Sequence, residues 1–247
     1  MTVDQEKNYA AIAAAELVED GMTVGLGTGS TVAYLLDALA KRSLNITCVS
    51  TSPHTEDVAR ALGIRVESFD GVGGLAHLDI AIDGADQVDP AGWLVKGGGA
   101  AHTREKRVAA AADRFVVIVS SEKIVPVIVA PIPLELLEFG LAATLRDLGD
   151  VRLRDVPRSP DGGLIADYFG DVGEVADLAA RLDAQTGVVD HGLFAPAMVS
   201  CVLVGHSEAA GALTASTETA GAETAGALTA SAETAGAGRV ERIDITP

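Results

Sequence analysis

Short apolar runs and longer amphipathic stretches follow one another regularly through the first half of the chain. The apolar runs at residues 22–26, 45–50, 65–69, 78–82 and 115–120 have the length and composition of strands. Amphipathic or Ala-rich stretches at 4–19, 31–42, 55–62 and 100–114 have the pattern of helices. This alternation predicts an α/β fold with a doubly wound, mostly parallel, Rossmann-like sheet.

The pattern changes after a cluster of prolines at 126, 131 and 133. Residues 134–149 and 171–187 look helical, whereas 151–156 and 163–169 look like strands. This order predicts a smaller α+β domain with a ferredoxin-like arrangement. We therefore expect two domains. Residues 1–130 together with 201–247 form the Rossmann-like catalytic domain, and residues 131–200 form the small one.

A low-complexity repeat interrupts the last part of the chain. Residues 211–225 are followed by a near-copy displaced by 15 positions, and both are built mainly from Ala, Gly, Thr, Ser and Glu. Such a segment has too few large apolar side chains to bury a core. Because strand-like runs precede and follow it, we expect residues 211–238 to be a loop insertion. An Ala-rich partial helix with a partner of its own is the alternative.

Charge and hydropathy limit the possible partners. The chain has 18 Lys and Arg against 35 Asp and Glu, and the formal net charge of -17 opposes binding of nucleic acid. No apolar stretch reaches the ~20 residues needed to span a bilayer. The acidic, polar start lacks the pattern of a secretory signal, so we expect a cytoplasmic protein without a membrane partner. Cys48 and Cys201 are expected to be small buried residues rather than disulfide-bonded or catalytic ones.

The turn GLGTGST, residues 25–31, connects a predicted strand to a predicted helix. Its glycines allow the backbone to approach an anion, and the hydroxyls of Thr28, Ser30 and Thr31 add donors to the N–H groups of the helix start. It lacks the Lys of a P-loop and the spacing of a dinucleotide fingerprint. Taken alone, the motif fits a phosphate site and a simple capping turn equally well.

Two further motifs carry charged side chains. DIAIDGADQVDP delivers Asp83 and Asp86 at the carboxyl end of a buried strand, where open α/β sheets bind ligands, although Asp residues also cap turns. KGGGAAHTREK places Lys96 before three glycines and Glu105 in the first turns of a helix. Glu105 could face a pocket as a base and Lys96 could stabilise an oxyanion, although a lone Glu there more often lies on a solvated helix face. The five His residues show no metal-ligand spacing, so no metal and no cofactor are expected.

Together with TSPHT, SSEK and GVVDHGLF, these motifs resemble ribose-5-phosphate isomerase A in order and spacing, from the first helix to about Gly205 and again in GRVERIDI. The resemblance implies reversible aldose–ketose isomerisation of D-ribose 5-phosphate and D-ribulose 5-phosphate through an enediolate, within the non-oxidative pentose phosphate pathway. It also implies a metal-free mechanism and a homodimer or homotetramer. A non-catalytic sugar-phosphate sensor, or another sugar-phosphate isomerase or deaminase on a similar fold, is the alternative.

The resemblance also implies roles for individual residues. Glu105 is the base, Asp83 or Asp86 helps to open the sugar ring, and Lys96 stabilises the enediolate. Gln87 and His102 depart from the family pattern without removing a catalytic group, and the segment after Lys123 is shorter than usual. The implied substrate-binding residues are Thr28, Gly29, Ser30, Thr31, Asp83, Gly84, Ala85, Asp86, Lys96, Gly97, Gly98, Gly99 and Lys123.

Overall fold

The main sheet of the protein has eight strands in the order β14-β15-β13-β7-β4-β1-β2-β3. The structure is a computed structural model that describes residues 2–206, 229–235 and 238–245. The six strands from β13 to β3 are parallel, and β15 and β14 add an antiparallel edge, which confirms the predicted doubly wound sheet. The strands are β1 (Thr23–Leu26), β2 (Thr47–Ser50), β3 (Arg65–Val66), β4 (Ile80–Asp83), β7 (Phe115–Ser120), β13 (Cys201–His206), β14 (Thr229–Ala235) and β15 (Gly238–Asp244).

Both faces of this sheet are covered. Alternate residues of the central strands pack into two separate cores, so that Ile80 and Ile82 lie on one face and Ala81 lies on the other. Helices α1 (Val3–Glu16), α2 (Ser30–Arg42) and α3 (Pro53–Ala61) contribute to the first core, and α4 (His102–Ala110) contributes to the second. The strands of the sequence are nearly continuous apolar runs because both faces of the sheet are buried.

Local sequence signals explain where the helices begin. Thr2 and Gln5 form a capping box at the start of α1, and Ser52 accepts a hydrogen bond from the N–H group of Thr55 at the start of α3. The buried face of α1 is largely Ala, which lets the helix approach the sheet closely. Gly205 of β13 has no side chain to keep α1 away, because a Cβ there would lie 1.9 Å from the carbonyl oxygen of Glu6.

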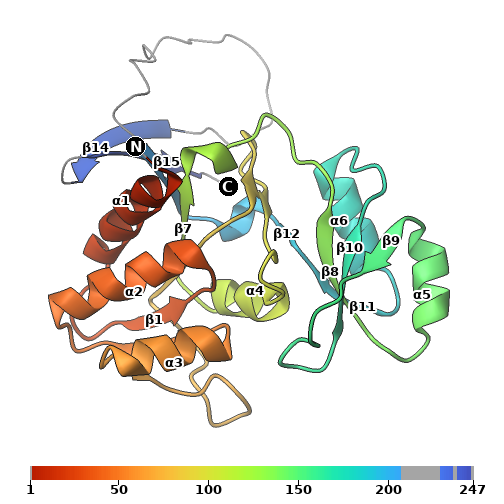
Figure 1. Ribbon diagram of the computed structural model, residues 1–247, viewed down its shortest axis with the longest axis horizontal. Helices are drawn as coiled ribbons and strands as arrows, with labels where there is room; N and C mark the ends of the chain where they lie inside the picture. Colours follow the sequence, from red (N-terminus) through yellow and green to blue (C-terminus); the bar gives the residue numbers. More distant parts are fainter. Residues whose placement is uncertain (1, 207–228, 236–237, 246–247) are drawn as a thin grey trace.

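A second sheet contains β8 (Ile132–Leu136), β9 (Val151–Leu153), β10 (Leu164–Tyr168) and β11 (Val188–His191) in the order β11-β8-β10-β9, entirely antiparallel. Helix α5 (Leu141–Leu148) connects β8 to β9, and helix α6 (Val175–Asp183) connects β10 to β11, so each helix joins two strands that have a third strand between them. This succession is the ferredoxin-like arrangement that the sequence predicts. Figure 1 shows this sheet beside the main one, with α4 between them.

The prediction of a helix over 134–149 is wrong at its start. Residues 134–136 belong to β8, which is flanked by β10 and β11, and the helix begins only at Leu141 after Gly140. Leu and Glu favour helices in isolation, but every residue of β8 is buried and pairing on both sides of the strand overrides that preference.

The repeat also differs in part from its prediction as a loop. Thr229–Ala235 form β14, which pairs with β15 along the edge of the main sheet. Pairing at an edge uses backbone N–H and C=O groups and therefore does not require large apolar side chains. Residues 211–228 and 236–237 of the predicted insertion lie outside the described residues.

A small three-stranded sheet of β5 (Gln87–Val88), β6 (Leu94–Val95) and β12 (Leu193–Phe194) joins the two parts. Val88, Leu94 and Phe194 pack into the second core of the main sheet, so the residues that follow β11 return to this core. Within the described ranges, no helix combines the length and apolar character that crossing a membrane requires.

Candidate active site

The three predicted motifs come together at one edge of the main sheet and enclose a pocket of about 190 Å³. The glycine turn follows β1, the DGAD segment follows β4 and the KGGG segment follows β6. Every predicted site residue except Asp83 lines the pocket, and Asp83 lies buried beneath it. The lining residues are Lys7, Thr28, Gly29, Ser30, Thr31, Gly84, Ala85, Asp86, Lys96, Gly97, Gly98, Gly99, Glu105 and Lys123.

Asp83 joins the first two turns. Its Oδ1 accepts hydrogen bonds from the N–H groups of Thr28 at 3.1 Å and Gly84 at 2.7 Å. Gly27 has no side chain at the point where the Asp83 carboxyl group passes, since a Cβ there would lie 1.9 Å from its Cγ. The sequence GLGTG therefore reflects a close approach of two chain segments as well as the start of α2.

We predict that Gly27→Ala lowers the free energy of unfolding by about 3 kcal/mol, the upper range for overpacking a core, because the new methyl group must displace Asp83. Urea unfolding measures the change. Gly73→Ala is the matched control, because no atom lies within 4 Å of a Cβ at Gly73, and it should change stability by less than about 0.5 kcal/mol. Equal stability of the two variants would contradict the close approach.

Lys96 lies at the centre of the site and is 3% exposed. Its ammonium group contacts three oxygens: the carbonyl of Gly84 at 2.6 Å, Oδ2 of Asp83 at 2.8 Å and Oε2 of Glu105 at 3.1 Å. The first of these contacts is a hydrogen bond and the other two are ion pairs, and Oε2 of Glu105 has no hydrogen-bond partner among the described residues. The contact with Glu105 is the longest of the three.

Two buried carboxyl groups therefore share one ammonium group. Burial, aided by the charge of Asp83, raises the pKa of Glu105 to about 8 although Lys96 opposes the rise. Burial also raises the pKa of Asp83 above its usual range against the same opposing charge. Burial alone would lower the pKa of Lys96, but Asp83 and Glu105 together raise it. Lys96 stays charged, and Glu105 can exchange a proton near neutral pH.

The other charged residues of the pocket are one carboxylate and two lysines. Asp86 is exposed at the rim, and its Oδ2 accepts a hydrogen bond from Gly98 N–H at 2.8 Å. Lys123 ends the short helix η1 (Ser121–Lys123) after β7, and Lys7 comes from α1. Sequence reasoning missed Lys7, because it belongs to no motif and reaches the pocket only through the packing of α1 on the sheet.

A larger pocket of about 580 Å³ lies elsewhere, between α3, the segment 67–76 and α4. It contains none of the predicted site residues, and four of its charged side chains pair with one another. Arg104 contacts Asp161 at 2.8 Å, and Arg60 contacts Glu56 at 2.6 Å. The smaller pocket is the better candidate for the active site, because it contains Lys96, Glu105 and the other predicted residues.

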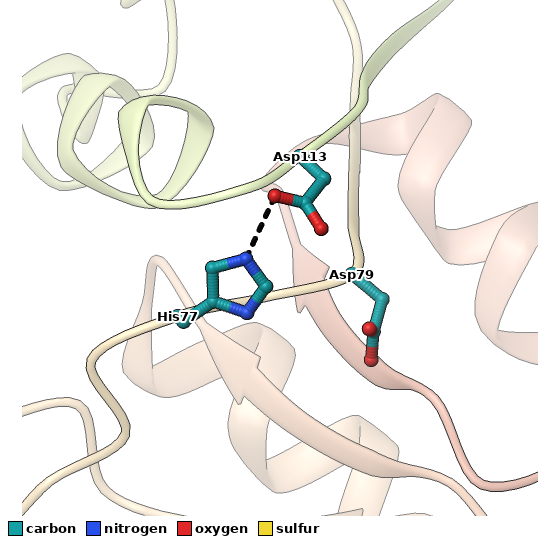
Figure 2. A group of neighbouring side chains, drawn as sticks. All are labelled: His77, Asp79 and Asp113. Carbon is teal, nitrogen blue, oxygen red and sulfur yellow. Dashed lines mark hydrogen bonds and ion pairs between the residues drawn. The ribbon is translucent and has the colours of Figure 1, made fainter.

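Figure 2 shows a cluster of His77, Asp79 and Asp113 at the start of β4 and the end of α4, away from the glycine turns. His77 Nε2 lies 2.7 Å from Asp113 Oδ1. Oδ2 of Asp79 accepts hydrogen bonds from the backbone N–H group of Thr23 at 2.6 Å and from its hydroxyl at 2.7 Å. The three side chains therefore have partners within the protein, and their contacts link β1, the start of β4 and the end of α4.

Comparison with known proteins is consistent with this geometry. The family model "Ribose 5-phosphate isomerase A (phosphoriboisomerase A)" matches residues 47–209, and the model "DeoR C terminal sensor domain" matches residues 3–71. A ribose-5-phosphate isomerase A of Caulobacter sp. (strain K31) is 46% identical over 209 residues, which cover 78% of this chain and 91% of that protein. One of Lacticaseibacillus paracasei is 40% identical, covering 87% of this chain and 99% of that protein.

Solved structures give the same result for the fold. Ribose 5-phosphate isomerase A from Neisseria gonorrhoeae superposes with a TM-score of 0.78 at 32% identity, covering 84% of this chain and 95% of that one. A D-ribose-5-phosphate isomerase in complex with phospho-erythronic acid superposes with a TM-score of 0.75 at 34% identity, covering 83% and 95%.

Proposed function

Because the chain belongs to the ribose 5-phosphate isomerase A family, we propose that its pocket interconverts D-ribose 5-phosphate and D-ribulose 5-phosphate through an enediolate. The observation that carries the mechanism is the contact of Lys96 with Asp83, Glu105 and the Gly84 carbonyl in one pocket. A carbon acid next to a carbonyl group loses its proton only when the developing oxyanion is stabilised. Glu105 and Lys96 provide a base and an electrophile side by side.

We assign the phosphate group to the part of the pocket that is lined by the start of α2 and the two lysines. α2 begins at Ser30 and its first N–H groups favour an anion, while the hydroxyls of Ser30 and Thr31 add donors. Lys7 and Lys123 line the same pocket and supply positive charge in a protein of net charge -17. The overall charge therefore does not prevent recognition of a phosphorylated sugar.

Asp86 is the better candidate for ring opening. Asp83 accepts two backbone N–H groups and contacts Lys96, so its oxygens are engaged. Asp86 is exposed at the pocket and has one oxygen, Oδ1, without a hydrogen bond in the described residues. It can accept the proton of the ring hydroxyl, and Asp83 then serves to hold Lys96.

In the open-chain sugar, the Glu105 carboxylate takes the proton from C2. The electron pair forms the C1=C2 bond, and the carbonyl oxygen on C1 becomes an oxyanion beside Lys96. Glu105 then returns the proton to C1, while the proton of the hydroxyl group on C2 passes to the oxygen on C1. The product is the ketose. Substrate oxygen replaces Glu105 as the third acceptor of Lys96, because that contact is the longest, and the released carboxylate becomes more basic.

The direct test is the conversion of ribose 5-phosphate to ribulose 5-phosphate by the purified chain with a chelator present. We expect conversion that the chelator does not diminish. Conversion of an amino-sugar phosphate, with none of ribose 5-phosphate, would favour the deaminase or alternative isomerase. Binding without any conversion would favour the sensor, although the match to the sensor domain ends before Asp83, Lys96 and Glu105.

The pH profile tests the raised pKa of Glu105. A base acts only when ionised, so kcat/KM should rise with pH and level off above about 8, where the free enzyme's Glu105 is deprotonated. The same profile measured for Glu105→Gln should lose this rise. A native profile that is flat between about pH 6 and pH 9 would contradict a titrating base with a raised pKa.

The assembly and location of the protein complete the proposal. We place the enzyme in the cytoplasm as a homodimer or homotetramer. Large apolar side chains that are exposed in the single chain, such as Phe139, Val127 and Val129, would be buried by a second copy. Light scattering that detects only monomer would contradict the oligomer.

A further inference from the structure

Arg154, which follows β9 in the second sheet, reaches into the glycine loop of the active site. Its guanidinium group donates hydrogen bonds to the carbonyl oxygens of Gly97 at 2.8 Å and Gly98 at 3.3 Å. Asp167 of β10 holds the same guanidinium group from behind with two hydrogen bonds, at 2.6 and 2.7 Å. The side chain of Arg154 is 18% exposed, so this interaction is partly shielded from water.

The orientation of the peptide groups follows from these two contacts. In a trans peptide, the C=O and the following N–H point in opposite directions. Arg154 on the carbonyl of Gly97 therefore directs the N–H group of Gly98 away from itself, and that N–H group donates to Asp86. Arg154 on the carbonyl of Gly98 likewise directs the N–H group of Gly99 away, on the side where Gly99 lines the pocket.

The N–H group of Gly99 is available to a ligand. Within residues 2–206, no hydrogen bond uses this N–H group as donor, although its neighbours Gly98 and Ala100 donate to Asp86 and to the carbonyl of Gly97. Gly99 lines the pocket, and a Cβ there would meet a methyl group of Thr28 at 3.5 Å, an ordinary contact distance. An unpaired N–H group beside a pocket is suited to stabilising a developing negative charge.

The loop is held in a conformation that the backbone alone disfavours. Gly97 has a φ of 104° and Ala100 has a φ of 61°, which is unusual for a residue with a side chain. His102 also restricts the loop, because a Cβ at Gly97 would lie 2.7 Å from its Nδ1. An external contact with the two carbonyls is therefore needed to fix the direction of the N–H groups.

We propose that Arg154 is a positioning residue of the isomerase reaction. From the second sheet it orients and polarises the Gly97–Gly98 and Gly98–Gly99 peptide groups, so that Gly99 N–H stabilises the enediolate oxygen and Gly98 N–H holds Asp86. The inference rests on the proposed isomerase function. It assigns to the ferredoxin-like part of the chain a share in catalysis, in keeping with the place of α4 between the two sheets in Figure 1.

Arg154→Met tests this proposal, with Arg152→Met as the matched control. Arg152 lies two residues earlier in β9, is exposed, and contacts Asp150 and the ring of Phe169 but no part of the pocket. In Arg154→Met we expect kcat to fall about 10- to 100-fold, less than the loss of an oxyanion donor itself can cost, with KM nearly unchanged. Arg152→Met should keep native kinetics.

Inhibition constants distinguish a positioning role of Arg154 from a general loosening of the pocket. Phospho-erythronic acid has an anionic carboxylate next to the position of the reacting carbons, so its inhibition constant should rise in Arg154→Met along with the loss of kcat. The inhibition constant of inorganic phosphate, which occupies the other end of the pocket, should stay the same. Guanidinium ion at millimolar concentration should restore part of the activity of Arg154→Ala and none of that of Glu105→Gln.

Three results would overturn the inference. One is a kcat of Arg154→Met close to the native value. Another is a parallel weakening of phosphate and phospho-erythronic acid inhibition, which would indicate a merely structural role. The third is an inactive native protein, which would overturn the proposed function together with this inference, whereas the first two leave the isomerase function intact.

Discussion

Glu105→Gln should lower kcat for ribose 5-phosphate by about 10²- to 10⁴-fold, the range that a positioned general base contributes, while KM changes little. The amide has the shape of the carboxyl group and can still accept a hydrogen bond from Lys96, but it cannot take the proton from C2. Initial rates of ribulose 5-phosphate formation measure the effect. Glu16→Gln, an exposed change at the end of α1, is the control and should have native rates.

Stability distinguishes this loss from unfolding. Burial raises the pKa of Glu105 in the folded protein above that of an unfolded chain, so stability falls as pH rises from the unfolded value through the folded value of about 8. Gln removes that penalty, and the variant should be as stable as the native protein or more so at alkaline pH. A Glu105→Gln variant that retains most of the native kcat would refute the assignment of the base.

Lys96→Met should have the second large effect, on both activity and stability. Removal of the ammonium group leaves Asp83 and Glu105 buried without their shared partner, and breaking a buried ion pair from one side costs about 3–5 kcal/mol. The enediolate also loses its electrophile, so kcat should fall to near background. Urea unfolding at pH 8, together with the isomerase assay, measures the two losses.

The double variant Asp83→Asn/Lys96→Met separates them. Asn removes the uncompensated charge of Asp83, so part of the lost stability should return, whereas activity should not. A single Lys96→Met variant with native stability would contradict the buried arrangement of the three side chains. Recovery of activity in the double variant would contradict the role of Lys96 in the reaction.

The sequence predicts the part of the site that depends on parallel strands. Every residue of β4 and β7 is buried because both faces of these strands are covered, and their nearly continuous apolar runs are recognisable without knowledge of the fold. Since carboxyl ends of parallel strands meet at one edge, the turns that contain Thr28 and Asp83 had to lie together. The place of Glu105 is predictable as well, because it lies in the first turns of the helix that comes after the KGGG segment.

Other features depend on tertiary contacts that no local pattern records. The residues of β8 combine Leu and Glu in a way that favours a helix, and only pairing with two neighbouring strands makes them a strand. Lys7 and Arg154 reach the glycine loops from α1 and from the second sheet, across large separations in sequence. Asp83 lies buried beneath the pocket, because Gly27 has no side chain where the Asp83 carboxyl group passes.

Hydrogen isotope transfer tests the central claim, proton transfer by Glu105 through an enediolate, most directly. The native protein would convert ribose 5-phosphate in D₂O, and NMR would follow deuterium at C1 of the ribulose 5-phosphate formed. A carboxylic acid that carries the proton between C2 and C1 can exchange it with solvent, so we predict deuterium at C1 that depends on Glu105. Deuterium that appears at C1 at the native rate with the Glu105→Gln variant would contradict proton transfer by Glu105.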